Sequence, residues 1–212
     1  MSTAGESSLR EAICTAGRSL FERGLTHGST GNISVKLDDG YLMTPTGSSL
    51  GDLDPARLSR LDPQGRLLDG DAPTKESFLH AAMYDERPRS RAVVHLHAHW
   101  STAVSVLDDV DPDDALPALT AYYVMRVGTL PLVPYHAPGD LQLAAAVRGF
   151  AGRHHAVLLA NHGPVVAGSS LAAAGDAIEE LEETARLWLM TRPAPLNDEQ
   201  IAELRQHFGA IW

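Results

Sequence analysis

The sequence predicts an α/β (α+β) protein in which a mixed sheet carries helices on both of its faces. Segments with the apolar texture of strands are interleaved with segments of helical period, and a stretch rich in hairpins comes early in the chain. The length of 212 residues suits one substantial core and is short for two. We therefore expect a single domain over residues 1–212.

The predicted elements can be placed along the chain from local signals. Apolar residues at helical spacing predict a helix over 7–23 that Gly24 ends, and the turn "DDG" between "NISVKL" and "YLMT" predicts a β-hairpin. A strand and turn over 57–70 are followed by a helix over 74–86, with Thr74 or a neighbour as its cap, and by a strand over 91–98. Next come a helix near 100–107, an acidic loop over 108–119, a strand over 128–135 and a helix from about Asp140 to Phe150. The last segments are strands over 155–161 and 164–168 and helices over 171–191 and 197–208.

Composition narrows the classes of partner. A formal net charge of −10 argues against a nucleic-acid or anionic-membrane surface, because both need a basic field. The polar start "MSTAGESS" lacks the apolar stretch of a signal peptide, and no segment has the length of a membrane span. The single cysteine, Cys14, fits a reducing compartment and, within the first helix, a small buried apolar side chain. We expect a cytoplasmic protein.

The segment "AVVHLHAHW", residues 92–100, places three histidines in an apolar run. On a strand, side chains alternate between faces, so His95, His97 and, further along, His99 would share one side. A single histidine in such a place is most often a hydrogen-bonded core or rim residue. Two neutral imidazoles side by side with little solvent are costly unless they share a proton donor, a ligand or a metal.

Two other segments can complete a metal site. In "LLANHGPVV", His162 stands at the end of an apolar strand beside Gly163, where a plain turn residue is the simpler interpretation. In "PTKES", Glu76 lies in the first turn of a helix, where the helix dipole alone would favour a carboxylate. Taken together, three imidazoles and one carboxylate form a donor set suited to Zn²⁺, or to Mn²⁺, Fe²⁺ or Co²⁺.

The order "GSTGNIS", "TPTG", "PTKE", "VVHLHAH" and "NHG", spread over nearly the whole chain, resembles the class II aldolase/adducin family. The resemblance implies a three-layer αβα fold around a central, mostly antiparallel mixed sheet. It also implies a Zn²⁺ ion held by four residues, with the glutamate acting in addition as the acid/base group. These residues are Glu76, His95, His97 and His162. Aldolases of the family carry a further histidine three positions after the second ligand, where this chain has Trp100, and His99 is left out of the ligand set.

Glycine-rich "GSTGN" and "TPTGSS" expose backbone N–H groups and hydroxyls that suit an anion, although both segments also fit plain turns. The family resemblance implies that five residues bind the substrate phosphate, namely Asn32, Thr46, Gly47, Thr74 and Lys75. At the position of Lys75 the fuculose-phosphate aldolases have serine. An added ammonium group favours a substrate that carries a carboxylate as well as a phosphate.

The motifs "HGSTGNIS", "TPTGSSLG", "DAPTKE", "YYVMRVG", "ANHGPVVAG" and "AIEELEETA" resemble one subgroup of the family, the 3-oxo-tetronate 4-phosphate decarboxylases. The ketone of such a substrate is β to the carboxylate. Loss of CO₂ therefore leaves the enediolate of dihydroxyacetone phosphate, which a metal acting as a Lewis acid stabilises. The resemblance implies this reaction without an organic cofactor.

A proton donor to the enediolate carbon is also needed, and Glu76 is one candidate. The family aldolases use a tyrosine after a segment that matches "PALTAYYVM". The alignment does not separate Tyr122 from Tyr123, and we prefer Tyr123, although both also fit the role of core aromatics. Arg126 in the same segment suits either a substrate carboxylate or an ion pair with one of the many acids.

Two rival functions follow from the same resemblance. One is a fuculose-phosphate-type class II aldolase, and a dehydratase or epimerase of the same fold is a less favoured third enzyme function. The other is a non-catalytic head domain like that of adducins, which the presence of all four ligand types argues against. The family also implies a homotetramer, built as a four-fold ring with sites between subunits.

Overall fold

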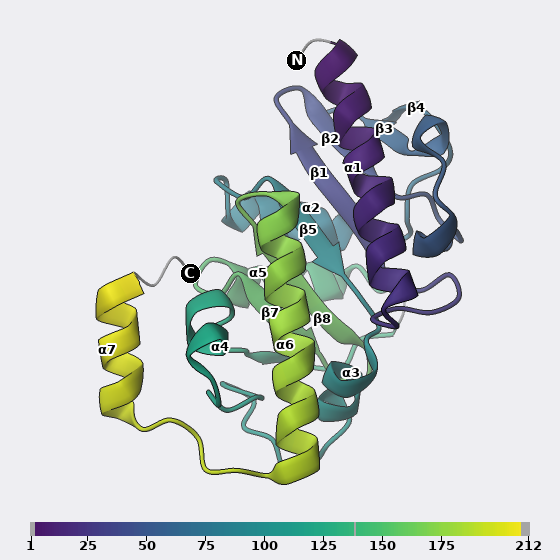
Figure 1. Cartoon of the computed structure of the whole chain (residues 1–212). Helices are drawn as coiled ribbons and strands as arrows, with labels where there is room; N and C mark the ends of the chain where they lie inside the picture. The colour runs from purple at the N-terminus through teal and green to yellow at the C-terminus, as the bar shows by residue number, and fades with distance from the viewer. Residues whose placement is uncertain (1–2, 138, 209–212) are drawn as a thin grey trace.

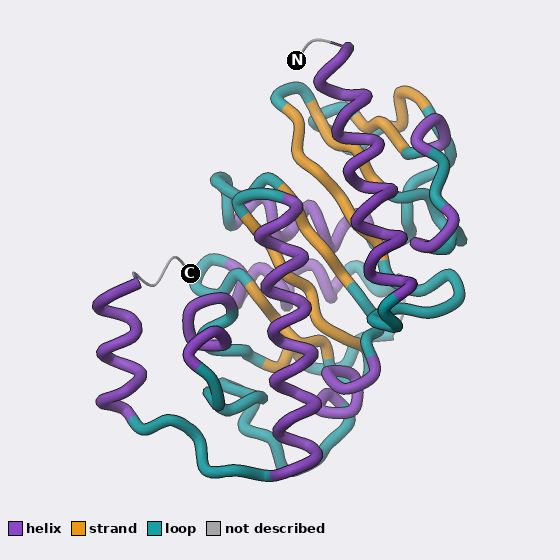
Figure 2. Tube along the Cα trace, in the orientation of Figure 1, coloured by secondary structure: helices purple, strands orange, loops and turns teal. Residues whose placement is uncertain are grey.

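A computed structural model describes residues 3–137 and 139–208 of the chain. Within them one sheet has the strand order β4-β3-β2-β1-β5-β8-β7-β6 (Figures 1 and 2). Its strands are β1 Asn32–Leu37, β2 Gly40–Met43, β3 Ser59–Leu61, β4 Leu67–Asp69, β5 Ala92–His95, β6 Leu132–Val133, β7 Ala156–Leu159 and β8 Gly163–Gly168. Every neighbouring pair is antiparallel except β6 and β7, which are parallel. The sheet is mixed and mostly antiparallel, as predicted.

Helices cover both faces of this sheet. They are α1 Thr3–Glu22, α2 Ser77–Glu86, α3 His99–Ser105, α4 Ala121–Arg126, α5 Gln142–Ala151, α6 Leu171–Thr191 and α7 Asp198–Phe208, with short 3₁₀ turns at Leu50–Asp52 and Pro55–Arg57. In Figure 1, α1 and α6 cross in front of the sheet, while α2 and α5 lie behind it. The three-layer αβα architecture expected from the sequence is therefore confirmed. Within the described ranges no helix combines the length and apolarity that crossing a bilayer would require.

Side-chain alternation along the strands divides the core into two parts. On β5, Ala92 and Val94 pack with the apolar side chains of α1 and α6, whereas Val93 packs with those of α2 and α5. This is the period of two expected for a strand covered on both faces. Because His95 follows Val93 by two residues, it belongs to the face that α2 covers. The sheet thus directs the first histidine of the run toward the start of α2.

The helix predicted over 74–86 begins at Ser77, three residues later than expected. The backbone N–H of Thr74 donates to the carbonyl oxygen of Thr44, 3.1 Å away, so this segment is tied to the end of β2. Glu76 occupies the N-cap position, but its side chain accepts no capping hydrogen bond. The carboxylate is therefore available for other contacts.

The strand predicted over 91–98 ends at His95, and α3 begins at His99. His97 consequently lies in the connection between them. His95 and His97 do lie close together as predicted, with ring centroids 5.0 Å apart, but the strand ends at His95, so strand alternation does not explain the position of His97. His97 reaches the site from an irregular segment.

Proline and local capping explain two further differences from the predicted elements. The strand expected over 128–135 is reduced to Leu132–Val133, because Pro131 and Pro134 flank it and have no N–H to donate to a sheet. The sequence did not predict α4. Its N-cap Thr120 accepts a hydrogen bond from the backbone N–H of Tyr123 at 3.0 Å, a common way to start a helix.

Candidate metal centre

Four side chains from distant parts of the sequence converge at one end of the central strands. Each of Glu76, His95, His97 and His162 offers one ligand atom, and these atoms all lie within 4.8 Å of one another. Glu76 comes from the start of α2, His95 from the end of β5, His97 from the segment after it, and His162 from the turn between β7 and β8. The structure thus brings together the four residues that the family resemblance implies as ligands.

Close packing of two strands places His162 in this group. A Cβ atom added to Gly163 would lie 2.2 Å from the carbonyl oxygen of Leu96, so only glycine allows β8 to approach the end of β5. Asn161 has a φ of +57°, a left-handed conformation that asparagine tolerates better than most residues. The motif "NHG" is therefore a tight turn that holds the imidazole of His162 opposite those of His95 and His97.

The tautomer of His95 is fixed by its backbone partner. Its Nδ1 lies 2.9 Å from the carbonyl oxygen of Pro164 and, since a carbonyl only accepts, Nδ1 carries the proton. The Nε2 atom of the neutral ring then has a free lone pair. It is buried and has no hydrogen-bond partner within the described part of the chain. A buried, unpaired nitrogen with a fixed lone pair matches what a metal-binding histidine requires.

The other three groups face the same point. The Nε2 atoms of His97 and His162 are 2.9 Å apart, and the Oε1 atom of Glu76 lies 3.3 Å from Nε2 of His162. The Oε2 atom of Glu76 lies 3.5 Å from Nε2 of His95. The distances between the ring centroids are 4.5, 4.8 and 5.0 Å. This is the arrangement of an N₃O donor set around one divalent cation.

Burial keeps the ligand histidines in the form that binds metal. It lowers the pKa of His97 to about 3 and that of His162 to about 4, with repulsion from His95 adding to both shifts. For Glu76, burial acts to raise the pKa, but the attraction of His95 and a hydrogen bond from Asn32 prevail, so this pKa is lowered. At neutral pH the site therefore presents the neutral imidazoles of His97 and His162 beside an ionised carboxylate.

The segments expected to bind phosphate lie next to this centre. The backbone N–H of Thr46 donates to the carbonyl oxygen of Ala72 at 2.9 Å, which sets "TPTG" beside "PTKE". Thr46, Gly47 and Lys75 are exposed, and Gly47 has a φ of +71° with open space around its Cβ position. Thr74 is buried, and its Oγ1 atom accepts from the backbone N–H of Glu76 at 3.3 Å. These contacts connect the segment "TPTG" and Thr74 to the backbone that carries Glu76.

The two candidate tyrosines lie in opposite surroundings. Tyr123 is fully buried, and its hydroxyl donates to the carbonyl oxygen of Leu116 at 3.1 Å, while burial raises its pKa well above the ordinary value. Tyr122 is 59% exposed, and the guanidinium of Arg126 lies over its ring. Arg126 also pairs with Asp176 at 3.7 Å. The structure does not bring Tyr123 to the histidine cluster within the chain.

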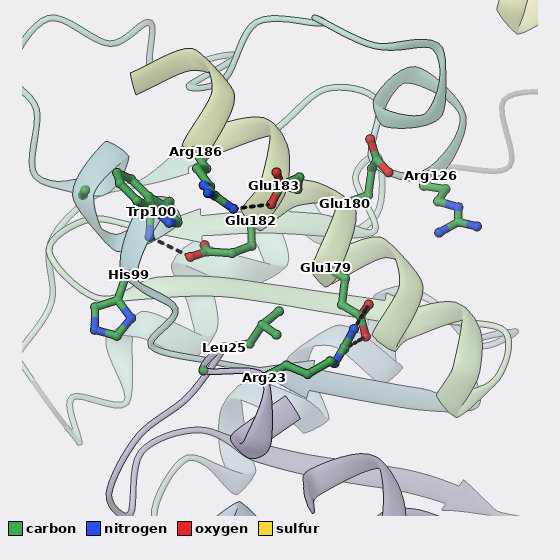
Figure 3. A pocket seen from close by; sticks show the side chains of 12 residues that line it. Arg23, Leu25, His99, Trp100, Arg126, Glu179, Glu180, Glu182, Glu183 and Arg186 are labelled. Carbon is green, nitrogen blue, oxygen red and sulfur yellow. Dashed lines mark hydrogen bonds and ion pairs between the residues drawn. The ribbon is translucent and has the colours of Figure 1, made fainter. Parts of the chain in front are cut away.

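His99, the residue left out of the predicted ligand set, lies apart from the cluster. It is exposed at the start of α3 and, with Trp100, lines a surface pocket formed largely by charged residues of α6 (Figure 3). The backbone N–H of Trp100 donates to Glu182 at 2.7 Å, which ties the start of α3 to α6. The departure from the aldolase pattern at Trp100 thus belongs to a different surface.

Sequence reasoning missed three buried polar residues, Ser34, His80 and Tyr84, that connect to the predicted Asn32 beneath Glu76. Asn32, Ser34, His80 and Tyr84 are all buried and hydrogen-bonded to one another. A signal was present, because Glu76, His80 and Tyr84 recur every four residues and so fall on one side of a helix. Asn32 and Ser34 alternate in the same way on β1.

The chain belongs to the family of the class II aldolase and adducin N-terminal domain, whose model matches residues 11–189. Among its relatives, a 3-oxo-tetronate 4-phosphate decarboxylase of Cupriavidus necator is 48% identical over 98% of this chain and 99% of its own length. An L-fuculose phosphate aldolase of Escherichia coli K12 is 35% identical over 87% of this chain and 86% of its own.

A solved structure extends this similarity to the fold. YgbL from Escherichia coli, described by the alternatives aldolase, epimerase and decarboxylase, has a TM-score of 0.91 and 48% identity. The similarity covers 94% of this chain and 99% of YgbL. The fold class and the family expected from the sequence are therefore confirmed, and the decarboxylases are more similar to this chain than the aldolases are.

Proposed function

We propose that the protein is a metal-dependent carboxy-lyase that converts a 3-oxo-tetronate 4-phosphate into dihydroxyacetone phosphate and CO₂. The observation that carries this proposal is the similarity to the Cupriavidus necator decarboxylase, 48% identical over nearly the full length of both chains. The convergence of three imidazoles and one carboxylate adds support, because it supplies what metal-assisted chemistry requires. All four proposed ligands come from the motifs that the resemblance singled out.

Each part of the site has a task in this reaction. When bound, a divalent metal, which we propose to be Zn²⁺ with Mn²⁺, Fe²⁺ and Co²⁺ as alternatives, supplies positive charge that stabilises the enediolate left by the departing CO₂. Asn32, Thr46, Gly47 and Thr74 bind the phosphate. The exposed ammonium group of Lys75 adds a positive charge for the substrate carboxylate, since a sugar acid phosphate is more anionic than a sugar phosphate.

The last step is protonation of the enediolate carbon. We propose Glu76 as the acid/base residue, because its carboxylate stands among the histidines; once displaced by a substrate, it would take up a proton from water and donate that proton to the enediolate carbon. A tyrosine is the second candidate. The hydroxyl of Tyr123 is bonded to the carbonyl oxygen of Leu116 inside the core, so we assign this role to the exposed Tyr122 in place of Tyr123. An exposed tyrosine is available to a site that a second subunit completes.

The test is an assay of CO₂ and dihydroxyacetone phosphate with purified, metal-loaded protein and a 3-oxo-tetronate 4-phosphate. We expect the wild type to form both products in equal amounts and Glu76→Gln to lose at least about 100-fold in kcat. Glu86→Gln is the matched control, because it makes the same change at the exposed far end of α2. Absence of CO₂ release by the wild type would reject the decarboxylase assignment.

A fuculose-phosphate-type aldolase is the second candidate function. It is favoured by the 35% identity to the Escherichia coli L-fuculose phosphate aldolase. The same protein preparation distinguishes the two functions. Condensation of dihydroxyacetone phosphate with an aldehyde, with the oxo-acid left intact, would support the aldolase.

We further propose a cytoplasmic homotetramer in which residues 1–212 form one domain. The cytoplasmic location is supported by the acidic composition and the single cysteine. The single-domain organisation is supported by the segment that leads to α7, because this segment is hydrogen-bonded to the rest of the fold. There the backbone N–H of Leu196 donates to the carbonyl oxygen of Ala118 at 2.8 Å. Light scattering of the purified protein tests the tetramer, which predicts four times the mass of the 22.7 kDa chain.

A further inference from the structure

A chain of hydrogen bonds runs from the interior of the fold to the carboxylate of Glu76. The hydroxyl of Ser34 lies 2.9 Å from that of Tyr84 and 2.7 Å from Nδ1 of His80. On the other side of the same ring, Nε2 of His80 lies 2.5 Å from Oδ1 of Asn32. The amide nitrogen of Asn32 then donates to Oε2 of Glu76 at 2.7 Å. We call these five residues the His80 network.

The donor and acceptor of every hydrogen bond in the His80 network follow from the carboxylate of Glu76 at one end of it. An ionised Glu76 can only accept, so the amide nitrogen of Asn32 must face it and Oδ1 must face His80. Because Oδ1 is an acceptor, Nε2 of His80 carries the proton. Nδ1 of the neutral ring therefore accepts from the hydroxyl of Ser34. The single hydroxyl proton of Tyr84 is then shared between two acceptors, the Ser34 hydroxyl oxygen at 2.9 Å and the carbonyl oxygen of Ser34 at 3.1 Å.

The surroundings of His80 indicate more than a space-filling role. Its side chain is fully buried, as are those of Leu79 and Met83 on the same helix, and an apolar residue at this position would be easier to desolvate. Burial also lowers the pKa of His80 to about 3, which keeps the ring neutral. Both ring nitrogens have partners, and both partners are themselves buried. The imidazole provides one donor and one acceptor on opposite sides, as this network requires.

We propose that His80 is a positioning residue that, through Asn32, fixes the orientation of the Glu76 carboxylate toward the metal. The donor at Nε2 of His80 prevents the amide of Asn32 from rotating by half a turn. A rotated amide would place its oxygen against the carboxylate and against the phosphate that Asn32 is proposed to bind. The inference rests on the proposed metal-dependent function.

The geometry connects this network to the ligand set. The same Oε2 atom that accepts from Asn32 lies 3.5 Å from the unpaired Nε2 of His95. Holding Oε2 therefore sets how the carboxylate faces the histidine whose lone pair is fixed. Partners that orient metal ligands in this way typically contribute about 10–100-fold to metal affinity or activity.

The experiment compares His80→Leu with His80→Gln in the full chain. Metal-free protein is titrated with Zn²⁺ to obtain a Kd, and kcat and KM are measured separately on the metal-loaded protein. Leucine removes the donor to Asn32, so we expect Kd to rise and kcat to fall by about 10–100-fold. Glutamine places an amide nitrogen where His80 has Nε2, so we expect both values to remain within about threefold of wild type.

Two further variants separate positioning from stability. Met83→Ala, in the core on the same helix, lowers the melting temperature but leaves the Zn²⁺ affinity unchanged. Ser34→Ala removes the donor that fixes the His80 tautomer, so it weakens Zn²⁺ binding in the same direction as His80→Leu but by a smaller factor. If His80→Leu fails to fold, Ser34→Ala and His80→Gln decide the question.

The outcomes are distinct from those of the functional assay. Wild-type Zn²⁺ affinity in both His80→Leu and Ser34→Ala would overturn the proposal. Equal losses in His80→Leu and His80→Gln would also overturn it, because they would indicate packing and not a donated hydrogen bond. If the wild type binds Zn²⁺ but releases no CO₂, the proposed decarboxylase fails while the Zn²⁺ titrations still test His80.

Discussion

At the scale of single residues, the adjacent tyrosines of "AYYVM" should affect different properties, Tyr122 the catalytic rate and Tyr123 the stability of the fold. Tyr123→Phe removes the donor to the buried carbonyl oxygen of Leu116, so we expect a loss of about 1 kcal/mol in the free energy of unfolding and an unchanged kcat. Tyr122→Phe removes an exposed hydroxyl, so stability should remain within about 0.5 kcal/mol while kcat falls. Denaturant unfolding and the CO₂ assay measure the two quantities. A fall in kcat for Tyr123→Phe alone would restore the preference for Tyr123.

The residues of the metal centre were predictable because the family motifs mark them, whereas their geometry was not. Alternation along a strand accounts for His95 but not for His97, since β5 ends between them. His80 carried a signal in its spacing from Glu76, but the partners that reveal its role come from β1, 46 and 48 residues away along the chain. Long-range pairing of this kind leaves no local pattern in a sequence.

At the scale of elements, one buried carboxylate holds the start of α3. Glu182 of α6 accepts from the backbone N–H groups of Trp100 and Ser101 at 2.7 and 2.8 Å, and from the Ser101 hydroxyl at 2.7 Å. These N–H groups have no partner within their own helix. The carboxylate therefore serves as a helix cap supplied by another helix, only a few residues after His97.

Removing this cap should destabilise the fold. We expect Glu182→Ala to cost about 2–3 kcal/mol, because it leaves buried donors unpaired. The neighbouring Glu183 is the matched control, since its pair with Arg186 lies on the surface and Glu183→Ala should cost less than about 0.5 kcal/mol. Urea unfolding of both variants provides the comparison. Equal costs would contradict the assignment of Glu182 as the cap of α3.

A second element-scale prediction concerns the contact of β5 and β8. Gly163→Ala places a Cβ atom 2.2 Å from the carbonyl oxygen of Leu96, so the strands must separate and His162 must move. We expect a loss of stability of more than about 2 kcal/mol together with weaker metal binding. Gly149→Ala is the control, because its Cβ would meet no atom within 4 Å in the last turn of α5. That variant should gain about 0.5–1 kcal/mol.

Most helices and the hairpin were predictable from local signals, and the exceptions have local physical causes. The periodic segments became α1 and α5 with shifted ends and α6 with the predicted ends, and "NISVKL" with "YLMT" became the hairpin β1–β2. The late start of α2 depends on the hydrogen bond from residue 74 to residue 44, and the helix α4 on the capping side chain of Thr120. Such tertiary and capping contacts override weak local propensity.

At the scale of the whole molecule, the apolar core of the layered fold is complete without the metal centre. Two separate apolar clusters, one under α1 and α6 and one under α2 and α5, hold the sheet without any contribution from the four ligands. The order of the eight strands could not be read from the sequence, because β1 pairs with β5 and β5 with β8 across long separations. We therefore expect the protein to stay folded when chelators remove divalent metal.

Metal should nevertheless raise the stability of the whole fold, because it binds the native arrangement of ligands and not the unfolded chain. At a free Zn²⁺ concentration 100 times Kd the expected gain is about 2.7 kcal/mol, which for a chain of this size is a rise in melting temperature of roughly 5–11 °C. His99→Ala should show the same rise, since His99 lines a different pocket. His95→Ala should show none, because it loses the buried nitrogen whose lone pair the fold leaves unpaired. Calorimetry with and without Zn²⁺ checks all three proteins, and an undiminished rise in His95→Ala would contradict the assigned centre.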